Sequence, residues 1–168
     1  MDVLLDSASA DSQARLNYWN ALQEFYLTDW RRLPDDQQLL VLRTSEDAVG
    51  SSDQFPPLQR TEENVPFEQL DLINKRLAIY TLAEGAGRRA GTVLSELFPR
   101  LEIQLNHNKS ATNALVNLAK TADYFVFSSR SAAHKAFYSV TRQREDILFP
   151  AGRGSSSIVR CFLEAIRG

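Results

Sequence analysis

The chain has 168 residues, of which 43% are apolar and 24% are charged, and its formal net charge is −2. It can bury a core of its own, but no stretch approaches the roughly 18 apolar residues that span a bilayer, and the first residues do not resemble a signal peptide. We therefore expect a soluble cytoplasmic protein without membrane contact, in which the single cysteine, Cys161, is a buried small side chain that forms no internal disulfide.

The net charge conceals a division of the chain. Residues 1–70 carry five Lys and Arg against thirteen Asp and Glu, whereas residues 71–168 carry fourteen against eight, so the balances are −8 and +6. Such asymmetry indicates that the two halves have different partners or are partners of each other. We predict an acidic N-terminal helical extension with a linker over residues 1–70 and an α/β domain over residues 71–168.

The acidic region begins with a predicted amphipathic helix that Ser9 or Asp11 can cap. Its aromatic face contains Leu16, Trp19, Leu22, Phe25 and Tyr26. We expect this face to pack on the α/β domain, and an exposed partner-binding helix is the alternative. A short helix or strand over 35–42, a linker over 44–66 and a helical turn over 67–75 follow. This organisation is also typical of a piece cut from a longer polypeptide.

From residue 77 onward, a short apolar strand, a polar turn and an amphipathic helix recur four times. The predicted strands are residues 77–82, 101–105, 124–127 and 147–151, and the helices end near residues 98, 120, 142 and 166. This alternation predicts a Rossmann-like or flavodoxin-like parallel sheet in the order 2-1-3-4. We expect Ser110, Ser131 and Ser155 to cap helices. Right-handed crossovers place all four strand-to-helix turns at the carboxyl edge of the sheet.

The first of these turns contains glycines at a spacing that formally fits a dinucleotide-binding fingerprint, Gly85-x-Gly87-x-x-Ala90. The second strand, however, ends in Asn106 and His107 rather than in the acidic residue that binds a ribose, so we do not expect an NAD site. Two interpretations remain open, namely anion binding at the helix start and a tight turn that allows close helix packing.

Cationic and hydroxyl side chains gather in all four turns, and guanidinium groups suit phosphate oxygens. The predicted ligand-binding residues are Gly85, Gly87, Arg88, Arg89, Lys109, Ser128, Ser129, Arg130, Ser131, Gly152, Arg153, Gly154 and Ser155. Open α/β sheets bind ligands at this edge. We therefore predict a site for a phosphate-bearing ligand, a nucleotide or nucleic acid, with no other cofactor. Simple helix capping is the alternative.

Groups suited to catalysis are scarce. Glu84 is placed to act as a nucleophile or base and His134 lies in a first helical turn, although a solvated glutamate at a helix start is the simpler interpretation. The two histidines, His107 and His134, lack acidic or cysteine partners at ligand spacing, so no metal site is predicted. We expect a binding domain rather than an enzyme; any reaction would process a nucleotide or nucleoside.

Three stretches resemble the C-terminal Rossmann-like domains of large bacterial proteins from anti-phage defence and DNA-modification islands. They are Tyr80-Thr-Leu-Ala-Glu-Gly-Ala-Gly87, Ala122 to His134 and Ala151-Gly-Arg-Gly-Ser-Ser-Ser-Ile158. The resemblance covers about residues 72–168 and leaves the acidic half unmatched. It implies an intracellular bacterial protein that acts with other protein subunits near DNA or a nucleotide signal, and it transfers no catalytic residue.

Two other classes of protein fit the same pattern. A phosphosugar-binding domain also uses serine-rich turns after parallel strands, and a protein-docking module needs no ligand. Nucleic-acid binding favours exposed aromatic rings among the basic residues. The aromatic residues of this region are expected mostly in the core; they are Tyr124, Phe125, Phe127, Phe137 and Phe149.

Overall fold

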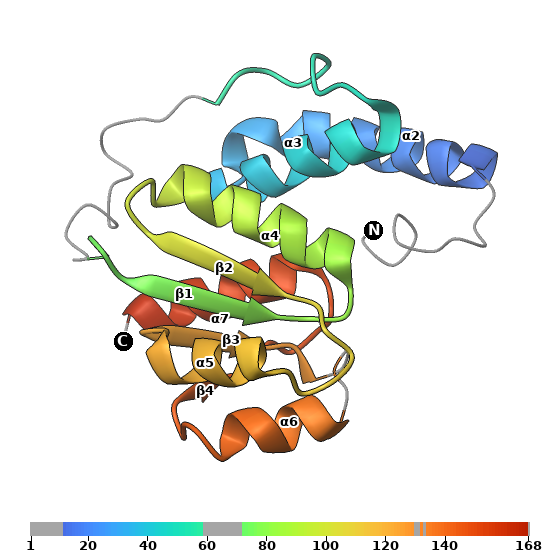
Figure 1. The fold of residues 1–168 in the computed structure, drawn as a ribbon. Coiled ribbons are helices and arrows are strands. Elements are labelled where there is room, and N and C mark those ends of the chain that lie inside the picture. Colours follow the sequence, from blue (N-terminus) through green and yellow to red (C-terminus); the bar gives the residue numbers. More distant parts are fainter. Residues whose placement is uncertain (1–11, 59–71, 130–131, 133, 168) are drawn as a thin grey trace. The chain divides into compact units, whose positions relative to one another are not determined.

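The computed structural model describes residues 12–58, 72–129, 132 and 134–167. The chain divides into two compact units, Met1–Gln69 and Leu70–Gly168, and Figure 1 shows the elements of each. Among the described residues, no helix combines the length and apolar character that a membrane crossing requires.

The N-terminal unit consists of α2 (Ser12–Asp29), a short 3-10 helix η1 (Trp30–Arg32) and α3 (Asp35–Val49). Its small core contains Trp19, Trp30, Val41 and Phe55. The Phe55 ring centroid lies 5.0 Å from that of Trp30 and 6.2 Å from that of Trp19. Gly50 ends α3 in the left-handed conformation, with φ 79°, which favours glycine.

Two predictions for this unit need correction. The helix after Pro34 continues to Val49, because Thr44 and Ser45 are buried parts of it rather than the start of a linker. Phe55, which we placed in the linker, is a core residue. On the aromatic face of α2, Trp19 contacts Phe55 within its own unit, while Phe25 is 64% exposed. The expected packing of this face on the α/β domain stays a prediction. The predicted helix start at residues 9–11 and most of the predicted turn at 67–75 lie outside the described residues.

The C-terminal unit has a parallel four-stranded sheet in the order β2-β1-β3-β4, as predicted. Its strands are β1 (Arg76–Tyr80), β2 (Glu102–Asn106), β3 (Tyr124–Phe127) and β4 (Ile147–Leu148). The helices that follow them are α4 (Glu84–Leu97), α5 (Asn113–Thr121), α6 (His134–Thr141) and α7 (Ser155–Arg167). The central strands β1 and β3 are almost wholly buried, whereas the edge strands are partly exposed and β4 has only two residues.

Helices cover both faces of the sheet, with α5 and α6 on one face and α4 and α7 on the other (Figure 1). Alternate residues of a strand point to opposite faces, so Tyr80 and Phe127 pack with α5 and α6 and stack on each other at 4.8 Å between ring centroids. On the other face, α7 buries the predicted stripe, which comprises Ile158, Val159, Phe162, Leu163 and Ile166. From β1 the chain continues to β2, the outer strand on one side of the sheet, whereas from β3 it continues to β4, the outer strand on the other side. The topological switch point therefore lies between β1 and β3.

Candidate functional site at the carboxyl edge of the sheet

The turn after β1 is held by the hydroxyl and backbone of the buried residue Thr81. Its amide donates to the carbonyl of Asn106 at 3.1 Å, and its Oγ1 accepts from the amide of Ala83 at 3.2 Å. No side chain caps the start of α4, where Ala83 occupies the N-cap position. Glu84 is exposed in the first turn of α4, a position where a carboxylate complements the helix dipole.

Gly87 is buried where α4 meets this turn. A Cβ atom built on Gly87 would lie 2.8 Å from Cγ2 of Thr81 and 2.9 Å from Cε1 of His107, closer than real side chains approach. This glycine is therefore required for close packing, which was one of our two interpretations of the fingerprint. Anion binding at the same turn stays a prediction.

His107 is held in a defined orientation beside α4. Its Nδ1 lies 2.8 Å from the carbonyl oxygen of Thr81. Because a carbonyl only accepts, Nδ1 must carry the hydrogen, and in the neutral ring Nε2 is then the hydrogen-bond acceptor. Sequence reasoning gave this histidine no role, and only its position at a strand end hinted at one.

We expect a nuclear magnetic resonance (NMR) spectrum of the side chain to show this tautomer directly. In a long-range ¹H–¹⁵N correlation spectrum recorded in alkaline buffer, where the imidazole is neutral, His107 should have a protonated Nδ1 and an unprotonated Nε2. The exposed His134, the only other histidine in the sequence, serves as the control. A protonated Nε2 on His107 would contradict the hydrogen bond to Thr81.

The turn after β2 is ordered by a side chain of β1 and by one of its own. Tyr80 donates its hydroxyl to the carbonyl of Asn108 at 2.9 Å. Thr112, and not the predicted Ser110, caps α5 by accepting a hydrogen bond from the amide of Leu115. The N-cap of α5 therefore lies two residues later than predicted. Lys109 is exposed at the tip of this turn and forms no ion pair with any described residue.

The turn after β3 begins with Ser128, whose amide donates to the carbonyl of Tyr80 at 2.9 Å and so ties the two strand ends at the switch point together. Ser128 is buried and Ser129 is exposed. The predicted ligand residues Arg130 and Ser131 lie outside the described residues. His134 is the exposed first residue of α6.

The turn after β4 places Arg153 in solvent, where it forms no ion pair within the described part of the chain. Ser155 is buried and is the first residue of α7 rather than its N-cap. Gly152 and Gly154 are half-buried. A Cβ on Gly152 would meet the Oγ of Ser157, a hydroxyl that can rotate away, so packing does not demand a glycine here as it does at Gly87.

The structure thus sorts the predicted site residues by accessibility. Exposed at or near the carboxyl edge are Glu84, Arg88, Lys109, Ser129, His134 and Arg153, while Gly85 is half-buried beside them. Gly87, Arg89, Ser128 and Ser155 are buried, and Arg89, at 3% exposure, lies past the first turn of α4. Among the described residues, no group of three or more His, Cys, Asp or Glu side chains could hold a metal ion.

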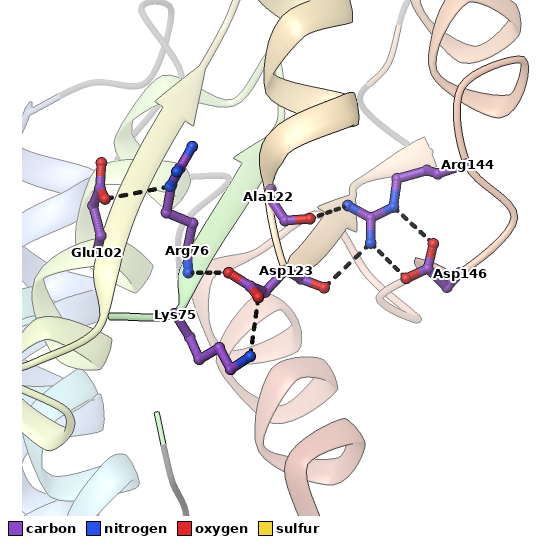
Figure 2. Close-up of polar contacts among 7 residues, drawn as sticks. All are labelled: Lys75, Arg76, Glu102, Ala122, Asp123, Arg144 and Asp146. Atoms are coloured by element: carbon purple, nitrogen blue, oxygen red, sulfur yellow. Dashed lines mark hydrogen bonds and ion pairs between the residues drawn. The ribbon is translucent and has the colours of Figure 1, made fainter. Parts of the chain in front are cut away.

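The opposite, amino edge carries a polar network that sequence reasoning missed (Figure 2). Asp123 accepts from the backbone amide of Arg76 at 2.8 Å and from Nζ of Lys75 at 3.2 Å. The hydrogen bond from the Arg76 amide and the Lys75 ammonium lower the pKa of Asp123 below its ordinary value. This carboxylate therefore fastens the start of β1 to the start of β3.

Arg144 forms the other half of this network. Its guanidinium donates to the carbonyls of Ala122 at 2.8 Å, Asp123 at 3.2 Å and Ala119 at 3.4 Å, and it pairs with both carboxylate oxygens of Asp146 at 2.9 and 2.6 Å. The same hydrogen bonds lower the pKa of Asp146. Because Ala119 and Ala122 lie at the end of α5, Arg144 satisfies carbonyls that the helix leaves open.

A parallel sheet with this strand order, whose carboxyl edge carries exposed cationic turns, defines an open α/β domain of the Rossmann-like kind. The model of the DpdD-like family matches residues 1–161, and the chain therefore belongs to this family. DpdD is part of the Dpd DNA-modification defence systems. This confirms the resemblance to defence and DNA-modification proteins and extends it to the acidic half, which we had left unmatched. Comparison with curated proteins and with solved structures found no match.

Proposed function

We propose that the carboxyl edge of the sheet binds a phosphate-bearing ligand, and specifically a short stretch of nucleic acid or a polyphosphorylated nucleotide. The observation that carries this proposal is the pair of exposed cations, Lys109 and Arg153, that no described residue neutralises. They come from turns that follow the two edge strands, and the uncapped start of α4 lies between them in the strand order. A helix N-terminus and flanking cations together favour anions.

The spacing of the two cations favours a polyanion over a single phosphate. Three strand spacings of about 4.8 Å separate β2 from β4, so the backbones of the two turns lie on the order of 15 Å apart along the edge. A ligand that contacts both cations therefore carries several phosphates, as an oligonucleotide does and a sugar phosphate does not. Membership of a family from DNA-modification defence systems supports the same ligand class. We place the protein with other Dpd proteins in the bacterial cytoplasm.

The test is the binding of a fluorescein-labelled 12-nucleotide single-stranded DNA to the full chain, followed by fluorescence anisotropy at low salt. We expect Lys109→Ala and Arg153→Ala each to raise Kd several-fold and to reduce the slope of log Kd against log salt by about one, as loss of one phosphate contact does. A thermal-shift panel of nucleotides, dinucleotides and sugar phosphates complements it, since a ligand at about one hundred times its Kd adds about 2.7 kcal/mol.

Matched controls come from the opposite edge of the sheet. Lys120 lies in the last turn of α5 and Arg142 directly follows α6, so Lys120→Ala and Arg142→Ala make the same charge changes away from the proposed site. These variants should bind DNA as the unsubstituted chain does. Equal losses at both edges would show binding by overall charge alone. A sugar phosphate whose binding responds only to Arg153→Ala would favour a phosphosugar site, and absence of binding to every compound would favour a docking module.

A further inference from the structure

The carboxyl edge carries an aromatic surface beside its cations. Phe149 directly follows β4 and is 48% exposed, although we had counted it among the core residues. The expectation fails because β4 has only two residues and ends at Leu148, so that Phe149 lies past the end of the strand, with its ring partly covered by Phe137 of α6. Tyr138, on α6, is 61% exposed.

The Phe149 ring packs against two other phenylalanine rings, one of which is buried. The ring centroid of Phe127, which is 1% exposed at the end of β3, lies 5.7 Å from that of Phe137 and 6.3 Å from that of Phe149. Phe137 and Phe149 are themselves 6.3 Å apart. Phe149 also precedes the buried Pro150, which restricts its backbone to extended conformations. The Phe149 ring is therefore half-exposed, and its remaining surface lies against Phe127 and Phe137.

Cationic and aromatic groups occur together in this part of the edge. Arg153 is four residues after Phe149 in the same turn, and the exposed Lys135 lies in the first turn of α6, three residues before Tyr138 and so on the same side of the helix. Exposed rings interleaved with cations are the pattern by which proteins bind single-stranded nucleic acids, because bases stack on the rings while phosphates meet the cations.

We propose that Phe149, supported by Phe137, is a stacking platform for a nucleobase whose phosphate is bound by the adjacent cationic turn. This inference rests on the proposed function and deepens it, because it requires the phosphate-bearing ligand to carry an unpaired base. The base belongs either to a free nucleotide or to a single strand of nucleic acid, and the sheet edge offers the same chemistry to both.

The experiment compares ligands with and without bases on the full chain. A labelled 12-nucleotide single strand and the matching abasic strand are titrated by anisotropy, and AMP and ribose 5-phosphate are used as competitors. We expect the base-bearing strand to bind about tenfold more tightly than the abasic strand, in line with the strength of base–aromatic stacking. Competition by AMP but not by ribose 5-phosphate at millimolar concentration would identify a free nucleotide as sufficient, and a preference that appears only with strands would identify single-stranded nucleic acid.

Variants of Phe149 separate stacking from folding. Phe149→Leu keeps an apolar side chain against Phe127 but removes the ring face, and it should abolish the preference for base-bearing strands, whereas Phe149→Tyr should retain it. Phe25→Ala, at an exposed phenylalanine of the N-terminal unit, should change nothing. If abasic and base-bearing strands bind equally and Phe149→Leu has no effect, the platform is refuted while the proposed function stands. If neither the strands nor any nucleotide of the thermal-shift panel binds, the platform and the proposed function are both refuted.

Discussion

Replacement of Arg144 by alanine is expected to lower the free energy of unfolding of the sheet unit by about 3 kcal/mol. The Arg144 side chain is only 8% exposed, and its guanidinium lies 5.7 Å from the centre of the Phe125 ring. Its loss would leave carbonyls at the end of α5 without their donors, and each buried polar group that loses its partner costs about 1–3 kcal/mol. The ion pair with Asp146, whose side chain is 73% exposed, contributes little to this loss of stability.

The measurement is urea denaturation followed by far-UV circular dichroism. Tryptophan fluorescence would be the wrong probe, since Trp19 and Trp30 are the only tryptophans and both belong to the N-terminal unit. Arg142→Ala is the matched control, because this exposed arginine of the same connection should change stability by less than about 0.5 kcal/mol. Arg144→Lys should resemble alanine, as one ammonium cannot reproduce the planar fork. Equal stability of the Arg142 and Arg144 variants would contradict this role.

Replacement of Gly87 by alanine should destabilise the same unit by about 1–3 kcal/mol, although alanine is the better helix former. The new methyl group would meet Thr81, which is fully buried, and the ring of His107, which is fixed by its hydrogen bond. Neither neighbour can move without breaking the turn after β1. Replacing a helix glycine by alanine usually stabilises a protein, but at Gly87 we predict the opposite.

Gly91, one turn further along α4, supplies the comparison. A Cβ there would lie 3.4 Å from Cδ2 of Leu105, which is an ordinary contact with a flexible side chain that is 38% exposed. Gly91→Ala should therefore stabilise the unit by up to about 1 kcal/mol through helix propensity. Thermal and urea melts of the two variants measure the difference. If Gly87→Ala proved as stable as Gly91→Ala, the close packing of α4 on the turn would be wrong.

Much of the sheet domain could be predicted because its signals are local. β1 and β3 are short continuous apolar runs, and α7 carries a regular apolar stripe, so the strands, the helices and their order follow from period and length. The extent of α3 could not be predicted, since its buried Thr44 and Ser45 look like loop residues. The Oγ of Ser45 donates to the carbonyl of Ser51 at 2.7 Å, which satisfies a polar group that periodicity alone places in solvent.

The meeting of the four turns at the carboxyl edge could be predicted, but the exposure of their individual side chains could not. Parallel topology brings the cationic turns to the carboxyl edge, independently of how their side chains are oriented. Which side chains are exposed depends on packing between residues far apart in the chain, as the hydrogen bond between His107 and Thr81 shows. Phe149 looked like a strand residue, and only the short length of β4 leaves its ring in solvent. Arg144 acts through backbone carbonyls, which no sequence pattern marks.

The most direct test of a ligand site at the carboxyl edge is an NMR titration of the ¹⁵N-labelled chain with short single-stranded DNA. We predict the largest amide shifts in the turns of the carboxyl edge, at Lys109, Ser129 and Arg153. Amides of the amino edge, at Lys75, Asp123 and Asp146, should stay in place. Shifts concentrated at the amino edge, or none at saturating DNA, would contradict the proposed site.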